Sequence, residues 1–470
     1  MLVPLLALAA AAQAPAASAD LSGIWEGTVG ALPVRACFAQ RDYGTFGAYY
    51  YLSRLRLIAL ETEDGLRGGF REGAGGGAGP APGGPRWRIE RAAGGQLTAR
   101  WTQGRRTLPV RLHRVARVAG EAGPCGSIVF HQPRLAGVRT VSARAAVDGV
   151  AYTRLALDHG GRFNVNVQSF ALDGDGEAVR RLNATLGAPL NGNPPDWLDC
   201  IRGGLDHLPY EGEWEQNLTP TLISRRWLDV TEQSGGYCGG AHPDWGSIHR
   251  TFDLTTGREI NLHDWLTAAA VKRERYDGSD EVFKTLQPAF RDFILRGWHP
   301  DPQQAECDEV IRMADFWNIG LTRDGLTFSP NLPHVVQACG EEFTVELDRL
   351  RPWLTADGAA LLGALHAEPA GARARAAPSL PTVGFVVPGR RGGAVILPES
   401  AVQTDGNGNY VYILDPNGTV VRRDVAIGRV GRRGVVIGSG LTGDERVVLA
   451  ASPFLNPGER VLPEPVRPGE

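Results

Sequence analysis

The stretch VILPESAVQTDGNGNYVYILDPNGTVVRRDVAIGRVGRRGVVIGSGLTGDERVVLAASPFLNPGERV, residues 395–461, has the most regular pattern in the chain. Apolar and polar residues alternate within it, and Gly, Asn, Asp or Pro bounds each run. Alternation with a period of two is typical of β-strands. The sequences DGNG at 405–408 and DPNG at 415–418 suit tight hairpin turns. The stretch therefore predicts a small all-β module built as a meander.

The same stretch resembles the C-terminal, membrane-proximal domain of the periplasmic adaptor proteins, or membrane fusion proteins, of RND efflux pumps. That domain is a permuted SH3-like β-barrel. The resemblance implies such a barrel over residues 382–465 and docking on an inner-membrane efflux transporter. Five motifs carry it: LPESAV (397–402), NYVY (409–412), VAIG (425–428), GSGLTGD (438–444) and FLNPG (454–458).

Five arginines make this module locally basic. Such a cluster could meet an acidic transporter surface or the anionic headgroups of lipids. Exposed charges at turns are the alternative interpretation, and the sequence leaves both open. The candidate binding residues of this group are Arg422, Arg423, Arg429, Arg432 and Arg433.

Upstream of the module, residues 367–381 are rich in Ala, Pro and Arg without periodicity, which predicts a linker. Residues 124–366 mix strand and helix patterns, so we expect a central α+β binding domain. Strands are predicted at 139–145, 151–157, 162–170, 219–232 (one long strand), 247–254, 317–321, 326–328 and 343–347. Helices are predicted at 176–186 and 197–207, and at 280–298 with an apolar stripe of Val282, Phe283, Leu286, Phe290, Phe293 and Ile294.

This central region resembles the C-terminal domain of unknown function shared by lysozyme-sensing anti-sigma factors and some peptidoglycan deacetylases. The resemblance implies a non-catalytic envelope domain that binds a protein such as lysozyme, or peptidoglycan. Tyr237 and His242 are the candidate binding residues within it. The motifs that carry it are YCGGAH (237–242), FDLTTG (252–257), INL (260–262), WL (265–266), GLTFSP (325–330) and FTV (343–345).

Residues 20–118 show short runs rich in aromatic and branched residues, which indicate a β-meander folded as a barrel or sandwich. The aromatic residues Tyr49, Tyr50, Tyr51, Trp25 and Trp101 could stack on sugars, but a meander must fill its own core, and we favour core packing. The Gly-rich segment 73–85 lacks the GK[ST] ending of a phosphate loop. It is expected to form a hairpin tip.

Composition and the N-terminus indicate where the protein acts. The 470 residues suffice for several domains, and the net charge of -3 argues against a nucleic-acid binder. Residues 1–19, MLVPLLALAAAAQAPAASA, have the apolar core and small residues of a cleaved signal peptide. No later segment approaches the roughly 20 apolar residues of a membrane span. We therefore expect a periplasmic protein without a transmembrane segment after signal cleavage.

The chain has six cysteines, an even number that favours disulfide bonds in an oxidising compartment. Fifteen pairings are possible in principle. Domain position and sequence proximity favour Cys37 with Cys125, Cys200 with Cys238, and Cys307 with Cys339.

Catalytic chemistry is weakly indicated. Cys238, His242, Asp244 and His249 could bind zinc, but their spacing matches no zinc signature and the glycines before His242 suggest a turn. The paired acids at 308–309 and 341–342 are better explained as solvated surface than as glycosidase carboxylates. No GxSxG nucleophile motif occurs. We expect no metal, no cofactor and no catalytic site.

The sequence thus predicts a multidomain protein: an N-terminal all-β meander, a central α+β domain and a C-terminal small β-barrel of permuted SH3-like type. The leading hypothesis is a non-enzymatic periplasmic envelope protein whose adaptor-like barrel contacts a transport machine. The alternatives are a lysozyme-binding or peptidoglycan-binding sensor or inhibitor and, more weakly, a wall-active metallohydrolase.

Overall fold

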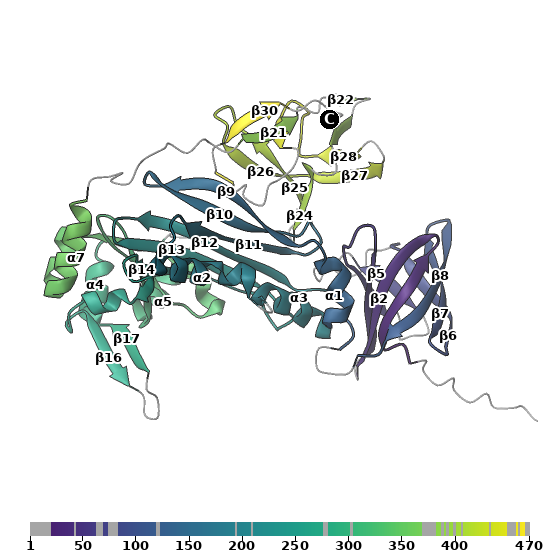
Figure 1. Ribbon diagram of the computed structural model, residues 1–470, viewed down its shortest axis with the longest axis horizontal. Coiled ribbons are helices and arrows are strands. Elements are labelled where there is room, and N and C mark those ends of the chain that lie inside the picture. Colours follow the sequence, from purple (N-terminus) through teal and green to yellow (C-terminus); the bar gives the residue numbers. More distant parts are fainter. Residues whose placement is uncertain are drawn as a thin grey trace, which may run out of the picture.

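The computed structural model describes residues 20–41, 44–62, 69–73, 83–118, 123–192, 195–207, 210–275, 281–300, 304–368, 382–386, 390–391, 394–397, 401–405, 408–431, 434–448, 457–458 and 461–465. The predicted signal peptide, most of the Gly-rich segment and most of the predicted linker lie outside these residues. The fold class is confirmed: the molecule is mostly β, with an N-terminal barrel, a central α+β region and a small C-terminal β module (Figure 1).

The N-terminal region is a closed eight-stranded barrel, which decides between the barrel and sandwich that the sequence allowed. Neighbouring strands pair in chain order, and β1 closes the ring by pairing antiparallel with β8. Burial alternates along β7, whereas β3 is buried on both faces over most of its length. The strands are β1 (Gly23–Val29), β2 (Leu32–Arg41), β3 (Gly44–Tyr51), β4 (Ile58–Thr62), β5 (Phe70–Gly73), β6 (Arg86–Ala93), β7 (Gln96–Gln103) and β8 (Arg106–Ala116).

Trp25, Tyr49 and Trp101 belong to the barrel core, as expected, whereas Tyr50 packs outside it, against Phe130 of α1 (Ile128–Leu135). Trp25 and Tyr49 are at most 1% exposed, and Trp101 is 6% exposed. The barrel interior also holds a carboxylate, which the sequence did not suggest. Oε1 of Glu72 accepts hydrogen bonds from Tyr49 Oη at 2.6 Å, Trp101 Nε1 at 2.7 Å and Trp87 Nε1 at 2.8 Å. Burial and the charge of Glu72 raise the pKa of Tyr49, so the phenol stays a donor.

The helix α1 (Ile128–Leu135) attaches the barrel to the central region. Its Arg134 is completely buried, and the guanidinium binds both carboxylate oxygens of Glu211, at 2.6 and 3.0 Å. The same guanidinium donates to the carbonyl of Leu55 in the barrel at 2.9 Å and to that of Arg162 in the central region. One buried side chain therefore connects both regions.

The central region contains a seven-stranded sheet in the order β15-β14-β13-β12-β11-β10-β9. Only the β11–β12 pair among these strands is parallel. A parallel pair needs a crossover connection, and α2 (Glu177–Asn191) and α3 (Asp196–His207) supply it along one face of the sheet (Figure 1). The strands are β9 (Arg139–Val147), β10 (Val150–Asp158), β11 (Val165–Leu172), β12 (Glu213–Ile223), β13 (Trp227–Tyr237), β14 (Asp244–Asp253) and β15 (Arg258–Ile260).

Smaller elements with a core of their own complete the central region. They include a β16–β17 hairpin and a three-stranded sheet β18-β19-β20. Their bounds are η2 (Leu262–Trp265), β16 (Val271–Arg275), β17 (Val282–Leu286), α4 (Pro288–Ile294), α5 (Cys307–Met313), β18 (Trp317–Leu321), β19 (Gly325–Pro330), η4 (His334–Cys339), β20 (Phe343–Glu346), α6 (Leu347–Leu350), η5 (Arg351–Trp353) and α7 (Ala356–His366).

Two predicted elements of this region are wrong. Residues 219–232 form a hairpin rather than one strand, because Ser224 accepts hydrogen bonds from the backbone of Arg226 and Trp227 and turns the chain between β12 and β13. The described part of the predicted helix 280–298 begins at residue 281 and forms strand β17 followed by α4 rather than one helix. Pro288 stands at the first helical turn, and the residue before a proline disfavours helical geometry. Of the predicted stripe, Phe290, Phe293 and Ile294 lie on α4, whereas Val282, Phe283 and Leu286 lie on β17.

The C-terminal module has two sheets, one of six strands and one of four, around an aliphatic core that includes Leu397, Val411 and Val447. It lies on the side of the central sheet opposite α2 and α3 (Figure 1). Its strands are β21 (Thr382–Val386), β22 (Arg390–Arg391), β23 (Ala394–Leu397), β24 (Gln403–Asp405), β25 (Gly408–Leu414), β26 (Val420–Asp424), β27 (Ala426–Gly431), β28 (Gly434–Ser439), β29 (Arg446–Val448) and β30 (Leu462–Pro465).

The structure contains three disulfides, Cys37–Cys125, Cys200–Cys238 and Cys307–Cys339. These are the pairs that sequence proximity favoured. The first joins the barrel to the segment preceding α1, and the second joins α3 to the turn after β13. Among the residues described, no helix is both long and apolar enough to cross a membrane.

Candidate functional site

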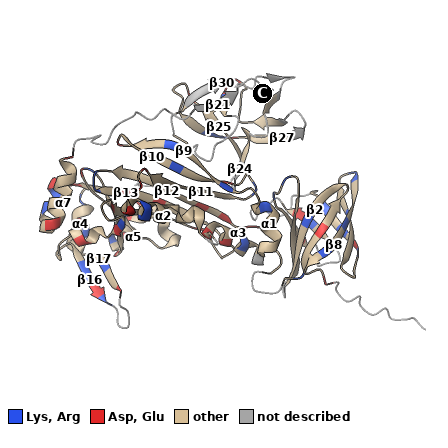
Figure 2. Cartoon of the chain, in the orientation of Figure 1, with Lys and Arg blue, Asp and Glu red and all other residues tan. Residues whose placement is uncertain are grey.

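A cleft of about 1980 Å³ lies between the open face of the central sheet and the C-terminal module. Its walls come from β11 to β14, from β17 and the segments around β18 to β20, and from β25 and β26 of the module. Acidic and basic residues are interspersed along the elements of the barrel and the central region (Figure 2). The cleft brings together parts of the chain more than 200 residues apart in sequence, such as Asn166 and Tyr410.

The module contributes an arginine and two tyrosines to this cleft. The guanidinium of Arg422 lies 3.9 Å from the ring centroid of Tyr410, and the rings of Tyr410 and Tyr412 are 5.5 Å apart. Arg422 also donates to Asp424 at 3.1 Å. Strand register explains the grouping, because Tyr412 pairs with Arg422 and Tyr410 with Asp424 across β25 and β26. Arg422 is therefore held against an aromatic surface.

The other predicted arginines are not all brought to this place. Arg423 is next on β26, is exposed, and points to the opposite side of the strand from Arg422. Arg429 belongs to β27, but its side chain is outside the described set, as are Arg432 and Arg433 entirely. The structure thus places one candidate arginine in the cleft and a second on an exposed surface.

Tyr237 and His242 lie on either side of the turn between β13 and β14. Tyr237 ends β13, lines the cleft, and stacks on Tyr210 with 6.4 Å between ring centroids. His242 is exposed and stacks on His334 at 5.1 Å. The two candidates therefore have separate surroundings, and only Tyr237 faces the cleft.

The structure does not bring together the candidate zinc ligands Cys238, His242, Asp244 and His249. The sulfur of Cys238 is bonded to that of Cys200. His249, on β14, lies between the carboxylates of Asp229 and Glu342. The paired acids also have local partners: Asp308 binds Arg312 at 2.9 Å, and Glu341 accepts from Trp298 Nε1 at 2.6 Å. Each of these groups contributes to local structure.

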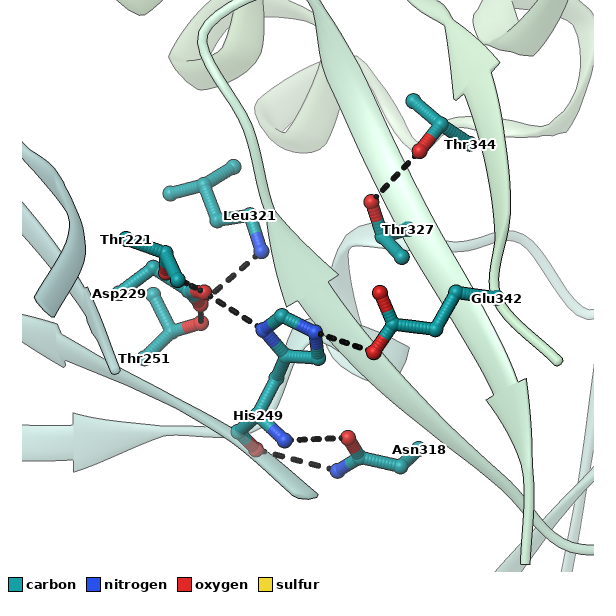
Figure 3. Close-up of polar contacts among 9 residues, drawn as sticks. All are labelled: Thr221, Asp229, His249, Thr251, Asn318, Leu321, Thr327, Glu342 and Thr344. Atoms are coloured by element: carbon teal, nitrogen blue, oxygen red, sulfur yellow. Dashed lines mark hydrogen bonds and ion pairs between the residues drawn. The ribbon is translucent and has the colours of Figure 1, made fainter. Parts of the chain in front are cut away.

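A buried polar network beside the cleft was missed by sequence reasoning (Figure 3). The side chain of Asp229 is 1% exposed and accepts hydrogen bonds from Thr251 Oγ1 at 2.6 Å, Thr221 Oγ1 at 2.8 Å and the Leu321 amide at 3.0 Å. His249 Nδ1 lies 2.8 Å from the same carboxylate. The network joins the large sheet to β18 of the small one.

His249 links this network to the exposed Glu342, which lies 3.2 Å from its Nε2. Burial opposes the charge of the imidazole, but the hydrogen bond and charge of Asp229, aided by Glu342, outweigh burial and raise the pKa of His249. No local spacing could have revealed this contact, because Asp229, His249 and Glu342 lie on three different segments. Only the pairing of β13 with β14 and the packing of the small sheet bring them together.

Comparison with known proteins concerns mainly the C-terminal module. Residues 393–451 match the family model described as the RND MFP C-terminal permuted SH3 domain. The efflux pump periplasmic linker BepF of Brucella suis is 33% identical over 71 residues, which are 15% of this chain and 17% of BepF. The matched part thus spans less than a fifth of that relative's length.

Two solved structures resemble the central region. One is a DUF3298 family member from Bacteroides fragilis, with 14% identity and a TM-score of 0.32, covering 49% of this chain and 98% of that chain. The other is a DUF3298 family protein from Pseudomonas aeruginosa, with 14% identity and a TM-score of 0.27, covering 47% and 96%. The family model identifies residues 393–451 as a C-terminal permuted SH3 domain of the RND membrane fusion protein type.

Proposed function

We propose that this protein is a non-enzymatic, periplasmic component of the cell envelope whose C-terminal module contacts an inner-membrane transport protein. The observation that carries the proposal is the match of residues 393–451 to the adaptor domain, supported by the similarity to a protein named as an efflux pump periplasmic linker. Three disulfides are consistent with an envelope location.

The exposed side of β26 is the proposed contact surface. Arg423 is exposed there, and a guanidinium can form bidentate contacts with carboxylates on a partner. Arg422, by contrast, is already engaged with Asp424 and Tyr410 on the cleft side. We therefore assign the transporter contact to the Arg423 side and keep the cleft separate from it.

The test is affinity purification of the tagged chain from detergent-solubilised envelopes, with the bound proteins identified by mass spectrometry. The full chain should recover an RND-type transporter, and a chain ending at Glu368 should not. Arg423→Glu should reduce recovery several-fold, because reversing a contact charge adds repulsion. Arg258→Glu, an equal change at an exposed site on β15, is the matched control.

Two results would overturn the proposal. One is recovery of the same transporter by the chain ending at Glu368, which would place the contact outside the module. The other is failure of the full chain to recover any membrane transporter when both chains are equally abundant and folded.

A further inference from the structure

The open face of the central sheet carries two rows of mostly polar residues across four strands. Strand register defines the first row as Asn166, Glu215, Gly235 and Trp245, on β11 to β14 in that order. The second row is Gln168, Asn217, Gln233 and Ser247. Residues paired in register point to the same face. Seven of these eight residues line the cleft, and Asn217 does not.

These rows face away from the helices. Ser169, which alternates with Gln168 on β11, donates to the carbonyl of Leu186 in α2, and Val167 packs with Leu190 of α2 and Leu198 of α3. Because side chains alternate along a strand, Asn166 and Gln168 must lie on the other face. That face has polar side chains where a sheet buried on both sides would have apolar ones.

The amides on this face hold one another in place. Asn217 Nδ2 donates to Glu215 Oε1 at 2.6 Å, Asn166 Nδ2 reaches the same oxygen at 3.4 Å, and Gln168 Nε2 donates to Asn166 Oδ1 at 3.0 Å. Such a network fixes the orientation of each planar group before a ligand arrives. Asn217 Oδ1 accepts no hydrogen bond from the described residues, but it is buried, and Asn217 does not line the cleft.

An aromatic ring ends the first row. Trp245 is 50% exposed, which is unusual for so large an apolar side chain. A Cβ at the opposing Gly235 would lie 2.6 Å from the Cβ of Trp245, so the ring stands beside a position that only glycine can occupy. Tyr237, two residues beyond Gly235, continues the aromatic edge of the same cleft.

We propose that this face binds an oligosaccharide of pyranose units. Sugar hydroxyls are both donors and acceptors, which matches amides that offer both groups and a carboxylate that accepts. The apolar face of a pyranose can pack on an exposed indole, whose large rigid surface loses little entropy on binding. The two rows themselves contain no lysine or arginine, and the basic residues of the cleft, Arg56, Arg162, Lys284 and Arg422, lie outside them.

The experiment uses the full chain and three uncharged probes, the tetrasaccharides of β-1,4-linked N-acetylglucosamine, β-1,4-linked glucose and α-1,4-linked glucose. Binding is followed by isothermal titration calorimetry, and folding of every variant by circular dichroism. Trp245→Ala should weaken binding of the preferred probe at least tenfold, and Gln233→Ala several-fold. Leu32→Ala, also 50% exposed but on the barrel, and Gln132→Ala on α1 are the matched controls and should bind like the parent.

Preference for one probe identifies the kind of linkage and supports the proposal. The proposal fails if none of the three saturates the protein at millimolar concentration. It also fails if Trp245→Ala and Gln233→Ala, both folded, bind as well as Leu32→Ala. Saturable binding of a basic peptide at this face without saccharide binding would assign the cleft to a polypeptide instead.

Discussion

The barrel and the C-terminal module are both small β structures, but they are stabilised in different ways. The barrel core combines aromatic with aliphatic side chains and includes the Glu72 carboxylate, whereas the module core is aliphatic and includes Val411, Ile413 and Val447. The barrel is also joined to the central region by the Cys37–Cys125 disulfide and by the buried Arg134. Specific polar contacts therefore contribute more to the stability of the N-terminal barrel, and apolar burial contributes more to that of the C-terminal module.

This difference indicates how each end responds to substitution. A buried donor that loses its acceptor keeps the full cost of its desolvation. An aliphatic core loses mainly transfer free energy and gains a cavity when it is trimmed. Four substitutions test this contrast, from the largest expected effect to the smallest.

Replacing Arg134 should have the largest effect. Arg134→Leu leaves Glu211 and the carbonyl of Leu55 without their buried partner, and breaking a buried ion pair costs about 3–5 kcal/mol. We expect the free energy of unfolding, measured with denaturant by tryptophan fluorescence, to fall by that amount. Arg144→Leu is the control, because its pair with Asp173 is exposed and such pairs contribute little to stability. Equal losses in both variants would contradict a special role for Arg134.

Glu72 tests the barrel interior. Glu72→Leu leaves three aromatic donors without an acceptor, and at about 1 kcal/mol or more for each donor we expect a loss of about 3 kcal/mol. Glu72→Gln keeps a carbonyl oxygen at the same distance along the side chain and should lose about 1 kcal/mol, because the acceptor is no longer charged. Thermal unfolding by circular dichroism ranks the two variants. A glutamine variant as unstable as the leucine variant would show that the charge, rather than the acceptor, is required.

Val411 tests the module core. Val411 is fully buried, and Val411→Ala should destabilise the module by about 2 kcal/mol through lost burial and a cavity. Tryptophan does not occur after Trp353, so fluorescence does not report on the module. Hydrogen exchange measured by mass spectrometry should show faster exchange in β25 and β29 and unchanged exchange in β1 to β8. Faster exchange in the barrel as well would mean that the two ends unfold together.

His249 tests the network between the sheets and has the smallest expected effect. Its raised pKa means that its contribution is complete below the unfolded value of about 6.5 and is lost as pH rises through the folded value. We expect the parent's unfolding free energy to fall over that range, and His249→Gln to remove this dependence. The exposed His242→Gln is the control. A parent protein that becomes more stable over the same range would contradict the assignment.

The sequence predicted those features that depend on local pattern. The hairpins around the DPNG turn and around Asp324 were predictable because turn chemistry is local, and the disulfide pairs followed from proximity. The hairpin at Ser224 and the strand before Pro288 were mispredicted, because alternation and helical spacing extend across a turn without changing.

The site depends on long-range pairing and could be predicted only in part. Tyr237 and Arg422 were singled out from their own segments, but their common cleft requires the module to lie against the sheet. The amide rows need the register of four strands, two of them joined in parallel through α2 and α3. A single polar residue in each strand carries no signal by itself. The same limitation hid Glu72 and Asp229, which resemble ordinary surface acids in the sequence.

The Cys37–Cys125 disulfide restricts where the chain can be divided into separately produced polypeptides. If the chain were divided between residues 118 and 124 into two separate polypeptides, the first would contain only Cys37 and the second five cysteines. Each polypeptide would then have one unpaired thiol, which could form wrong disulfides during secretion. A break between residues 369 and 381 would keep all three bonds in one product and no cysteine in the other. The C-terminal module can therefore be transferred to another protein without breaking a disulfide, whereas the barrel can be exchanged only together with the central sheet.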